Sequence, residues 1–235
     1  LEAVRGYEGR GSALYFEGFP KGFVGDWGFT RRVRRPPTDP VNSVLSLLYT
    51  FLMNRVYAAV RVAALDPYPG FLHAIDYGRH SLVLDLMEEF RPIIADTLTL
   101  SLFNLKILKK DDFYTERPLS ETLAGPQHPA VPDVTQDPIG WISTDCPTPG
   151  LMDLPEQSGI EAAPEAARTG KYPVKLREDA MRRVIEAFEK KLTTQFYYPP
   201  AERQLTYGEA LIHQAQHFRK VIEGEVDAYQ PVLLK

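Results

Sequence analysis

The stretch from Val41 to Leu65 constrains the fold more than any other part of the sequence. Its apolar side chains recur three and four residues apart, the spacing of one buried helix face. They are Val44, Leu47, Leu48, Phe51, Leu52, Val56, Ala59 and Val60. The Asp39-Pro40 step predicts the helix start, because proline is favoured in the first turn, and Asp66-Pro67 predicts the end. A stripe this wide predicts the central helix of a helical domain.

The most apolar run of this helix is too short to cross a membrane. Val44 to Met53 is interrupted by Ser46 and Thr50, whereas a membrane span needs ~20 apolar residues. The run therefore predicts a core helix, and we expect no membrane partner.

The composition is ordinary for a soluble globular protein. The chain has 235 residues, of which 44% are hydrophobic and 25% charged, enough for one or two domains. Its formal net charge is −4, so any nucleic-acid surface must be a local patch. The single cysteine, Cys146, excludes an intrachain disulfide and suits a reducing compartment. We expect a cytoplasmic protein.

Three more helical regions are expected around the central helix, which makes the predicted fold class mainly α. One begins near Ser81 and continues to about Leu108, with a break or kink after Arg91, because the ring of Pro92 excludes a carbonyl of the preceding turn. Amphipathic stripes predict two others, from Lys175 to Thr194 and from Thr206 to Ala228.

The segment in between has a different composition. Residues 116–173 hold ten of the 20 prolines and few periodic apolar positions, which predicts an irregular insertion or linker. The expected organisation is a helical catalytic core whose first part is residues 1–115, the proline-rich segment 116–173, and C-terminal helices of the same domain at 174–235.

The first residues, Leu1 to Phe19, also read as a helix, with no initiator methionine before it. Gly6, Gly9 and Gly11 each weaken an isolated helix by about 1 kcal/mol relative to alanine. Three such residues suggest close packing or the close approach of another group. The abrupt start suggests a fragment, or one domain of a longer polypeptide.

Carboxylates and a histidine are concentrated between Gly70 and Arg91. Asp85, Glu88 and Glu89 are spaced i, i+3 and i+4, so they are expected on one side of a helix. His73 precedes a turn at Tyr77-Gly78, from which the chain could fold back toward these acids. Imidazole and carboxylates together suit a divalent ion such as Mn or Mg. The alternative is a charged helix start with a hydrogen-bonded loop histidine.

A loop between Pro20 and Pro40 carries a dense positive patch. Its four arginines are Arg31, Arg32, Arg34 and Arg35. Arginine pairs bidentately with phosphate oxygens, so one interpretation is nucleic-acid contact. A solvated turn is the other.

Near the C-terminus, His213 and His217 have the i, i+4 spacing that can hold zinc. The metalloprotease version of this motif needs a glutamate after the first histidine, and Gln214 stands there. We favour a structural or solvated role for the pair.

Four stretches together resemble the CRISPR-associated endonuclease/integrase family called Cas one, the spacer-acquisition enzymes. They are RGYEGRGSALYF at 5–16, RRPPTDPVNSVLSLLYTFL at 34–52, DPYPGFLH at 66–73 and SLVLDLMEEFRP at 81–92. The resemblance covers residues 1 to about 113, is looser over the last two helices, and omits the proline-rich segment. It implies the family's multi-helix C-terminal catalytic domain, without the small N-terminal β domain.

The resemblance also implies a metal site. Carried over by position, the ligands of one Mg²⁺ or Mn²⁺ ion would be Glu8, His73 and Glu88, and Asp85 would be an auxiliary catalytic acid beside them.

The implied activity is DNA transesterification, in which the 3′-hydroxyl of a prespacer attacks a phosphodiester at the leader-repeat boundary of a CRISPR array. The implied partners are DNA, a second copy of the chain, and a small ferredoxin-like second Cas protein. Some family members are fused to a reverse transcriptase or to a Cas nuclease.

Two other functions are compatible with the same sequence. One is a non-catalytic helical scaffold that holds DNA or Cas partners and keeps the acids as relics. The other is a metal-dependent hydrolase acting on other phosphodiesters.

Overall fold

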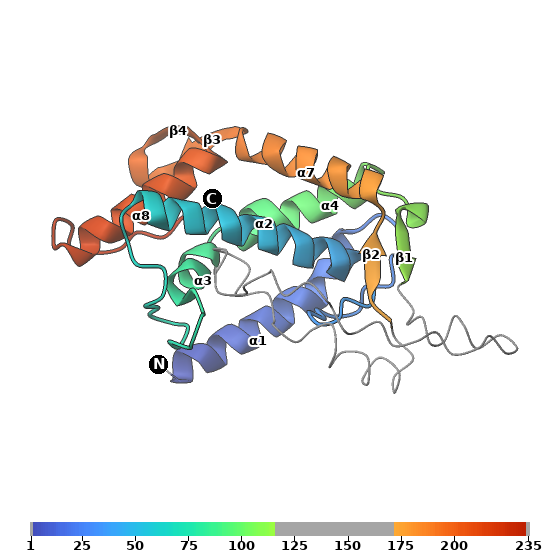
Figure 1. Cartoon of the computed structure of the whole chain (residues 1–235), viewed down its shortest axis with the longest axis horizontal. Helices are drawn as coiled ribbons and strands as arrows, with labels where there is room; N and C mark the ends of the chain where they lie inside the picture. The colour runs from blue at the N-terminus through green and yellow to red at the C-terminus, as the bar shows by residue number, and fades with distance from the viewer. Residues whose placement is uncertain (1, 116–171, 234–235) are drawn as a thin grey trace, which may run out of the picture.

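The long apolar helix is the centre of the structure. The computed structural model describes residues 2–115 and 172–233, and in it α2 spans Pro40–Val62. Asp39 caps this helix by accepting the Asn42 N–H at 2.8 Å. Helix α2 contacts α3, α4 and α8 and crosses the middle of the molecule (Figure 1). Its predicted position at the centre of a mainly α fold is confirmed.

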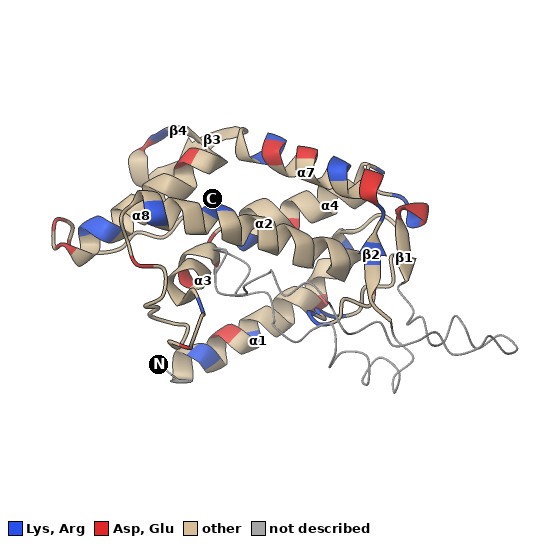
Figure 2. Ribbon diagram, viewed as in Figure 1, with Lys and Arg blue, Asp and Glu red and all other residues tan. Residues whose placement is uncertain are grey.

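By length and composition, α2 is the one helix in the described part of the chain that could cross a membrane. Half of its most apolar 18-residue window is buried inside the molecule. Core helices of the same length and composition are common, so this feature alone does not indicate a span. Arg55 and Arg61 are the only charged residues of α2, which is nearly uncoloured in Figure 2.

The helix expected from Ser81 to about Leu108 is divided into three pieces. They are α3 (Ser81–Met87), the π-helical turn η2 (Arg91–Asp96) and α4 (Thr97–Asn104). The predicted break near Pro92 is present, but α3 already ends at Met87. The chain also leaves the helical conformation before Leu108, at Lys106, whose φ is 57°. Asp85 therefore lies on α3, whereas Glu88 and Glu89 lie in the turn after it, so the three acids do not share one helix as predicted.

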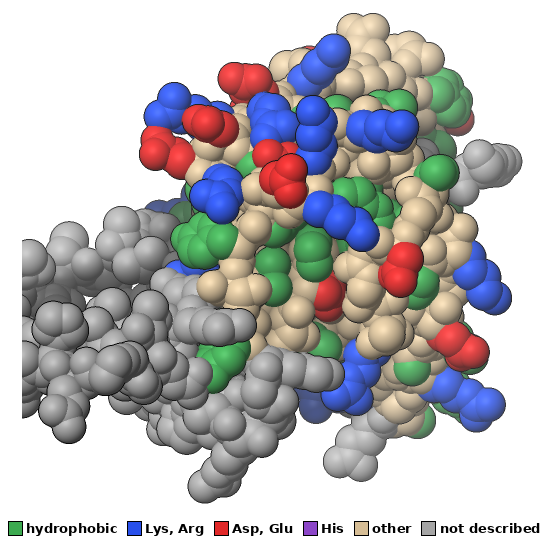
Figure 3. Space-filling view, turned by 90° about the vertical axis from the view of Figure 1, so that its right-hand side faces the viewer, with side chains coloured by type: hydrophobic (Ala, Val, Ile, Leu, Met, Phe, Trp, Pro, Cys, Tyr) green, Lys and Arg blue, Asp and Glu red, His purple; other side chains and the backbone are tan. Residues whose placement is uncertain are grey.

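A two-stranded sheet joins the two parts of the helical body. The 3₁₀ turn η3 (Lys110–Asp112) leads into β1 (Phe113–Thr115), which pairs antiparallel with β2 (Val174–Leu176), placing Phe113 opposite Leu176. Helix α7 (Glu178–Leu192) follows, so the helix predicted from Lys175 begins after a short strand. The proline-rich segment predicted at 116–173 lies outside the described residues except for its last two. Around this end of the molecule Lys and Arg side chains mix with Asp and Glu (Figure 3).

The last region contains a hairpin that the helical pattern did not predict. Strands β3 (Gln195–Tyr198) and β4 (Arg203–Thr206) pair antiparallel around η4 (Pro199–Ala201). Thr206 then caps α8 (Tyr207–Ile222) in a capping box with Glu209. The helix ends six positions before the predicted Ala228, and Gly224 takes a positive φ of 75° just beyond it.

Helix α1 (Glu2–Gly18) lies apart from this packed body, along the edge opposite α7 (Figure 1). Nearly all of its described side chains are exposed, and burial begins at Phe19 in the following turn η1 (Phe19–Gly22). A Cβ added at Gly6, Gly9 or Gly11 would meet nothing within 4 Å. The expected close packing at these glycines is therefore not made by any residue that the structure describes.

Candidate metal centre and nucleic-acid surface

The side chain of Asp85 holds the loop that carries His73. One carboxylate oxygen, Oδ1, accepts hydrogen bonds from the His73 ring Nδ1 at 2.6 Å and from the His73 backbone N–H at 3.0 Å. The other, Oδ2, accepts from the backbone N–H groups of Phe71 at 2.5 Å and Leu72 at 3.1 Å. An ionised carboxylate can only accept, so Nδ1 is the donor, and in the neutral imidazole Nε2 keeps its lone pair. This is how ligating histidines are oriented in metal sites.

The same bonds set the protonation of Asp85. Partial burial alone would raise the pKa of this carboxyl group, but the hydrogen bonds from His73, Phe71 and Leu72 outweigh burial and hold the pKa below its ordinary value. Asp85 therefore stays ionised and fixes the ring.

Gly70 allows this loop to wrap around Asp85. A Cβ at this position would lie 2.5 Å from the Ser81 Cβ and 3.0 Å from Asp85 Oδ2. Any side chain would push the loop away from α3. The glycine in the PYPGFLH stretch is thus required by close approach.

Glu88 lies in the turn after α3, partly buried. Its Oε1 pairs with Arg91 Nη1 at 2.6 Å, yet this buried oxygen receives no hydrogen bond of good geometry. Burial raises the pKa of Glu88, and the charge of Glu8 raises it further, whereas Arg91, His73 and Arg34 lower it. Glu8 and His73 are therefore both within electrostatic reach of Glu88.

Glu8 is exposed on α1, and two polar tethers locate this helix. Near its start, the Arg5 guanidinium donates to the Leu72 carbonyl at 2.7 and 3.0 Å, beside His73. Near its end, the Tyr15 hydroxyl donates to Asp96 Oδ2 at 2.7 Å. Together these contacts place the helix that bears Glu8 alongside the loop that bears His73.

Within residues 2–115 and 172–233, no three His, Cys, Asp or Glu side chains gather closely enough to hold a metal ion. The chemistry of the groups nevertheless fits a divalent cation. The His73 ring has one nitrogen bonded to Asp85 and the other available, and a buried oxygen of Glu88 has the ion pair with Arg91 but no hydrogen bond of good geometry. A cation beside Glu88 would also offset the mutual repulsion of Glu88 and Glu8.

Asp96 is a functional candidate that the sequence reasoning missed. It is 2% exposed, and its two oxygens accept from the hydroxyls of Tyr15 on α1 and Tyr49 on α2, each at 2.7 Å. The guanidinium groups of Arg32 and Arg91 both lie 5.3 Å from the Tyr49 ring centre. The sequence feature that could have indicated Asp96 is its position as the one acid in the apolar run IIADTLTL.

The arginine loop is fixed to α2 by Asn42, which is fully buried. Asn42 Oδ1 accepts from Arg32 Nη1 at 2.8 Å and from the Val33 N–H at 2.9 Å, and its Nδ2 donates to the Arg31 carbonyl at 2.9 Å. Arg32 also donates to Ser46 at 3.0 Å, and burial lowers the pKa of its guanidinium to about 10. The Arg32 guanidinium is thus occupied by the hydrogen bonds that hold the loop on α2.

The other three arginines of the predicted patch are Arg31, Arg34 and Arg35, and all are exposed. In the described part of the chain, their guanidinium groups make no hydrogen bond or ion pair. They are the members of the predicted nucleic-acid contact that can still bind an anion.

Glu89 points away from the candidate centre, into a separate polar network. It accepts from the Tyr229 hydroxyl, from the Val232 N–H at 2.7 Å and from Gln214 Nε2 at 3.2 Å. Gln214 Oε1 also accepts a hydrogen bond from the Tyr198 hydroxyl. Glu89 therefore holds the C-terminal segment, and the predicted grouping of Glu89 with Asp85 and Glu88 is corrected.

The two histidines of α8 belong to the same region. His217 Nε2 accepts the Gln230 N–H at 3.1 Å, and its ring stacks on Tyr229 with centroids 5.6 Å apart. The His213 ring packs edge-on against Tyr198 at 5.1 Å, and burial lowers the pKa of this imidazole. These contacts agree with the structural role favoured for the pair.

Residues 1–123 match the family described as CRISPR associated protein Cas1. This match covers more than half of the chain. The chain belongs to the Cas1 family. The four motifs that carried the resemblance all lie within the matched residues.

A relative over the full chain supports the assignment. The CRISPR-associated endonuclease Cas1 3 of Thermus thermophilus is 34% identical over 234 residues, which cover 100% of this chain and 54% of the relative. This Cas1-family chain thus spans about half the length of that protein.

Two solved structures share the fold. A casposase bound to integration product superposes with a TM-score of 0.68 at 18% identity, covering 97% of this chain and 49% of that one. A Cas6-RT-Cas1–Cas2 complex gives a TM-score of 0.68 at 22% identity, covering 100% of this chain and 20% of that one. The helical fold is therefore the one found in proteins that carry a Cas1 or casposase domain.

Proposed function

We propose that this chain is the helical catalytic part of a CRISPR-adaptation integrase. It would join the 3′-hydroxyl end of a prespacer DNA to a phosphodiester of the CRISPR array by transesterification. The observation that carries the proposal is the clamp of Asp85 on the His73 ring and loop, with Glu88 three residues after Asp85 in the turn that follows α3.

In this proposal Glu8, His73 and Glu88 hold one Mg²⁺ or Mn²⁺ ion. When bound, that ion would neutralise charge that develops on the attacked phosphate and lower the pKa of a coordinated hydroxyl. The available Nε2 of His73 and the buried Glu88 oxygen, which pairs with Arg91 without a hydrogen bond of good geometry, support this ligand set.

The chain's own residues then have separate tasks. Asp85 keeps the His73 ring in one tautomer and one orientation. Arg91 neutralises Glu88 and lies over Tyr49, whose hydroxyl is bonded to Asp96. Arg31, Arg34 and Arg35 would bind phosphates of the DNA backbone, fixing its path without reading its sequence.

The partners are part of the same proposal. The solved structures named above include a casposase bound to integration product and a Cas6-RT-Cas1–Cas2 complex. By this likeness we expect the complete protein to bind DNA, to pair with a second copy, and to assemble with a small ferredoxin-like Cas protein. A fused or associated reverse transcriptase or Cas nuclease is compatible with it.

The test is a strand-transfer assay with the complete protein and its partner. His73→Ala should abolish joining while DNA affinity stays close to that of the parent, because binding rests on the arginines. Asp85→Asn should lower joining by about 10–100-fold, the usual cost of losing a group that orients a ligating histidine. A His73→Ala protein that joins DNA at the parent rate would overturn the proposal in favour of a scaffold. Equal cleavage of unrelated phosphodiesters would instead favour a general hydrolase.

A further inference from the structure

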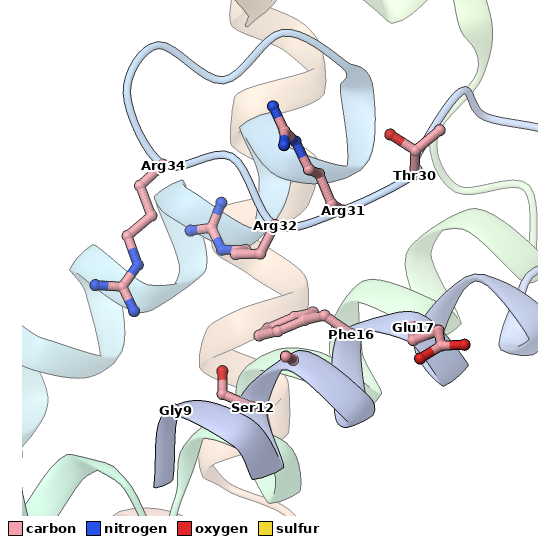
Figure 4. A pocket seen from close by; sticks show the side chains of 9 residues that line it. Gly9, Ser12, Phe16, Glu17, Thr30, Arg31, Arg32 and Arg34 are labelled. Atoms are coloured by element: carbon pink, nitrogen blue, oxygen red, sulfur yellow. The ribbon is translucent and has the colours of Figure 1, made fainter. Parts of the chain in front are cut away.

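Two neighbouring carboxylates follow α3, and they contact different parts of the molecule. Glu88 is within electrostatic reach of His73 and of Arg34 on the arginine loop. Arg34 in turn lines a cavity together with Gly9 of α1 (Figure 4). Glu88 therefore faces the loops and the helix that carry the other predicted ligands. The next carboxylate, Glu89, contacts α8 and the residues after it instead.

The backbone that carries both carboxylates is a turn between α3 and η2. The Glu88 N–H donates to the Asp85 carbonyl at 3.3 Å, and the Phe90 N–H donates to the Met87 carbonyl at 3.0 Å. Bonds to the third residue back have poorer geometry than those of an α-helix. Met87 and Phe90 are buried and fix the two ends of the turn. The peptide between Glu88 and Glu89 is therefore oriented largely by what these two side chains contact.

Glu89 accepts three hydrogen bonds from residues far along the chain. Its Oε1 accepts from the Tyr229 hydroxyl, and its Oε2 accepts from the Val232 N–H at 2.7 Å and from Gln214 Nε2 at 3.2 Å. Val232 and Gln214 are buried, so the donors themselves have little freedom to move. Hydrogen bonds to an ionised group are the stronger kind. Glu89 is therefore firmly attached to α8 and to the C-terminal segment, residues 229–233.

The C-terminal segment is also held on α8 by bonds that do not involve Glu89. Gln214 Nε2 donates to the Tyr229 hydroxyl at 2.7 Å and to the Gln230 carbonyl at 2.8 Å. The Gln230 N–H donates to His217 Nε2 at 3.1 Å. The segment is thus a fixed support, to which the side chain of Glu89 attaches the turn.

We propose that Glu89 is a positioning residue for the metal centre, because its hydrogen bonds to α8 and the C-terminal segment fix the turn from which Glu88 would reach the ion. The inference rests on the proposed function, in which Glu88 is a ligand. It adds to that function a support for the ligand that comes from the opposite end of the chain. The three hydrogen bonds on Glu89 and its place next to Glu88 carry it.

The test compares Glu89→Ala with Glu89→Gln in the 235-residue chain, by Mn²⁺ titration followed by electron paramagnetic resonance. Glu89→Ala removes every acceptor and should weaken Mn²⁺ binding about tenfold, the lower end of the range for groups that support metal ligands. Glu89→Gln keeps an acceptor oxygen for the Val232 N–H and an amide that can donate to the Tyr229 hydroxyl, so its affinity should stay close to that of the parent. Equal losses in the two variants would mean that Glu89 acts through its charge, as a ligand does, and would overturn the inference.

Asp112→Ala is the matched control. Asp112 also accepts from two distant donors, Arg183 Nη2 at 2.6 Å and the Lys109 N–H at 2.7 Å, but it joins η3 to α7. Its loss should lower the free energy of unfolding and leave Mn²⁺ affinity unchanged. A loss of Mn²⁺ affinity as large as that of Glu89→Ala would show a general loosening of the fold and would overturn the inference.

Hydrogen exchange in the metal-free chain gives a second readout, independent of any ion. In Glu89→Ala the amides of residues 88–90 should exchange faster than in the parent, whereas those of α2 should not change. In Glu89→Gln the turn should exchange as in the parent. An unchanged exchange rate of the turn in Glu89→Ala would overturn the inference.

The outcomes separate this inference from the proposed function. If the parent binds Mn²⁺ and Glu89→Ala binds it equally tightly, only the role of Glu89 is wrong. If the parent binds no Mn²⁺, the proposed metal centre fails, and faster exchange of the turn in Glu89→Ala would still support its attachment by Glu89.

Discussion

Helices α1 and α2 have 17 and 23 residues, yet different interactions hold them in position. Leu48 of α2 is 0% exposed, whereas Leu14 of α1 is 60% exposed. Burial of apolar surface therefore positions α2. Helix α1 is located mainly by the Arg5 and Tyr15 hydrogen bonds and by the aromatic residues at its end. Because the predicted ligand Glu8 is carried by the least buried helix of the described residues, we expect that activity and stability can be changed separately.

The largest effect is expected in the core of α2. Leu48→Ala should lower the free energy of unfolding by about 2–5 kcal/mol, because it leaves a cavity among buried neighbours. The same change at Leu14 on α1 should stay within about 0.5 kcal/mol, as at other exposed positions. Denaturant unfolding of the two variants checks this. Equal losses would show that α1 is packed like α2 and would break the comparison.

The next effect concerns the tether between α1 and the body. Tyr15→Phe removes one hydrogen bond to Asp96 and should cost about 1.5–3 kcal/mol of local stability, the value for a bond to a charged group. Amide exchange should quicken in α1 but not in α2, and strand joining by the complete protein should fall.

Tyr49→Phe is the matched control, because Tyr49 donates to the other oxygen of Asp96 from α2. It should lower stability without quickening exchange in α1. Identical exchange patterns in the two variants would show that Asp96 does not tether α1 selectively.

The smallest effect is a gain in stability. Gly11→Ala should make α1 more stable by about 1 kcal/mol, since alanine is the better helix former and the added Cβ meets nothing within 4 Å. Amide exchange of α1 should slow, with the unfolding of the body unchanged. A loss of stability would indicate that the expected close packing at this glycine exists after all.

The sequence predicted the bounds of α1 and α2 closely and the region after Ser81 less well. The spacing of the apolar residues predicted α2 to within a few residues, because the side chains that recur at helical spacing are the ones that become buried. The hairpin of β3 and β4 was not predicted, because strands of four residues are too short to show a distinctive period. The break after Met87 could be predicted only approximately from Pro92.

The candidate site divides in the same way. The approach of His73 to the acids near Asp85 could be predicted, because the loop and the helix are close in the chain. The Asp85 clamp on three backbone N–H groups was not, since backbone direction leaves no mark in the sequence. Asp96 and Asn42 were missed, because a single buried polar residue has no motif, and the partners of Asp96, Tyr15 and Tyr49, are distant in the chain.

Whether α1 and the His73 loop together hold a metal ion can be measured by titrating this chain with Mn²⁺ and following the titration by electron paramagnetic resonance. We expect one ion to be bound by the parent and, with equal affinity, by Glu17→Gln, which changes an acid of the same helix outside the ligand set. Glu8→Gln and His73→Ala should lose this binding, and Asp85→Asn should weaken it by about 10–100-fold. Binding by Glu8→Gln and His73→Ala at the parent affinity would contradict the claim that α1 and the His73 loop together hold the metal.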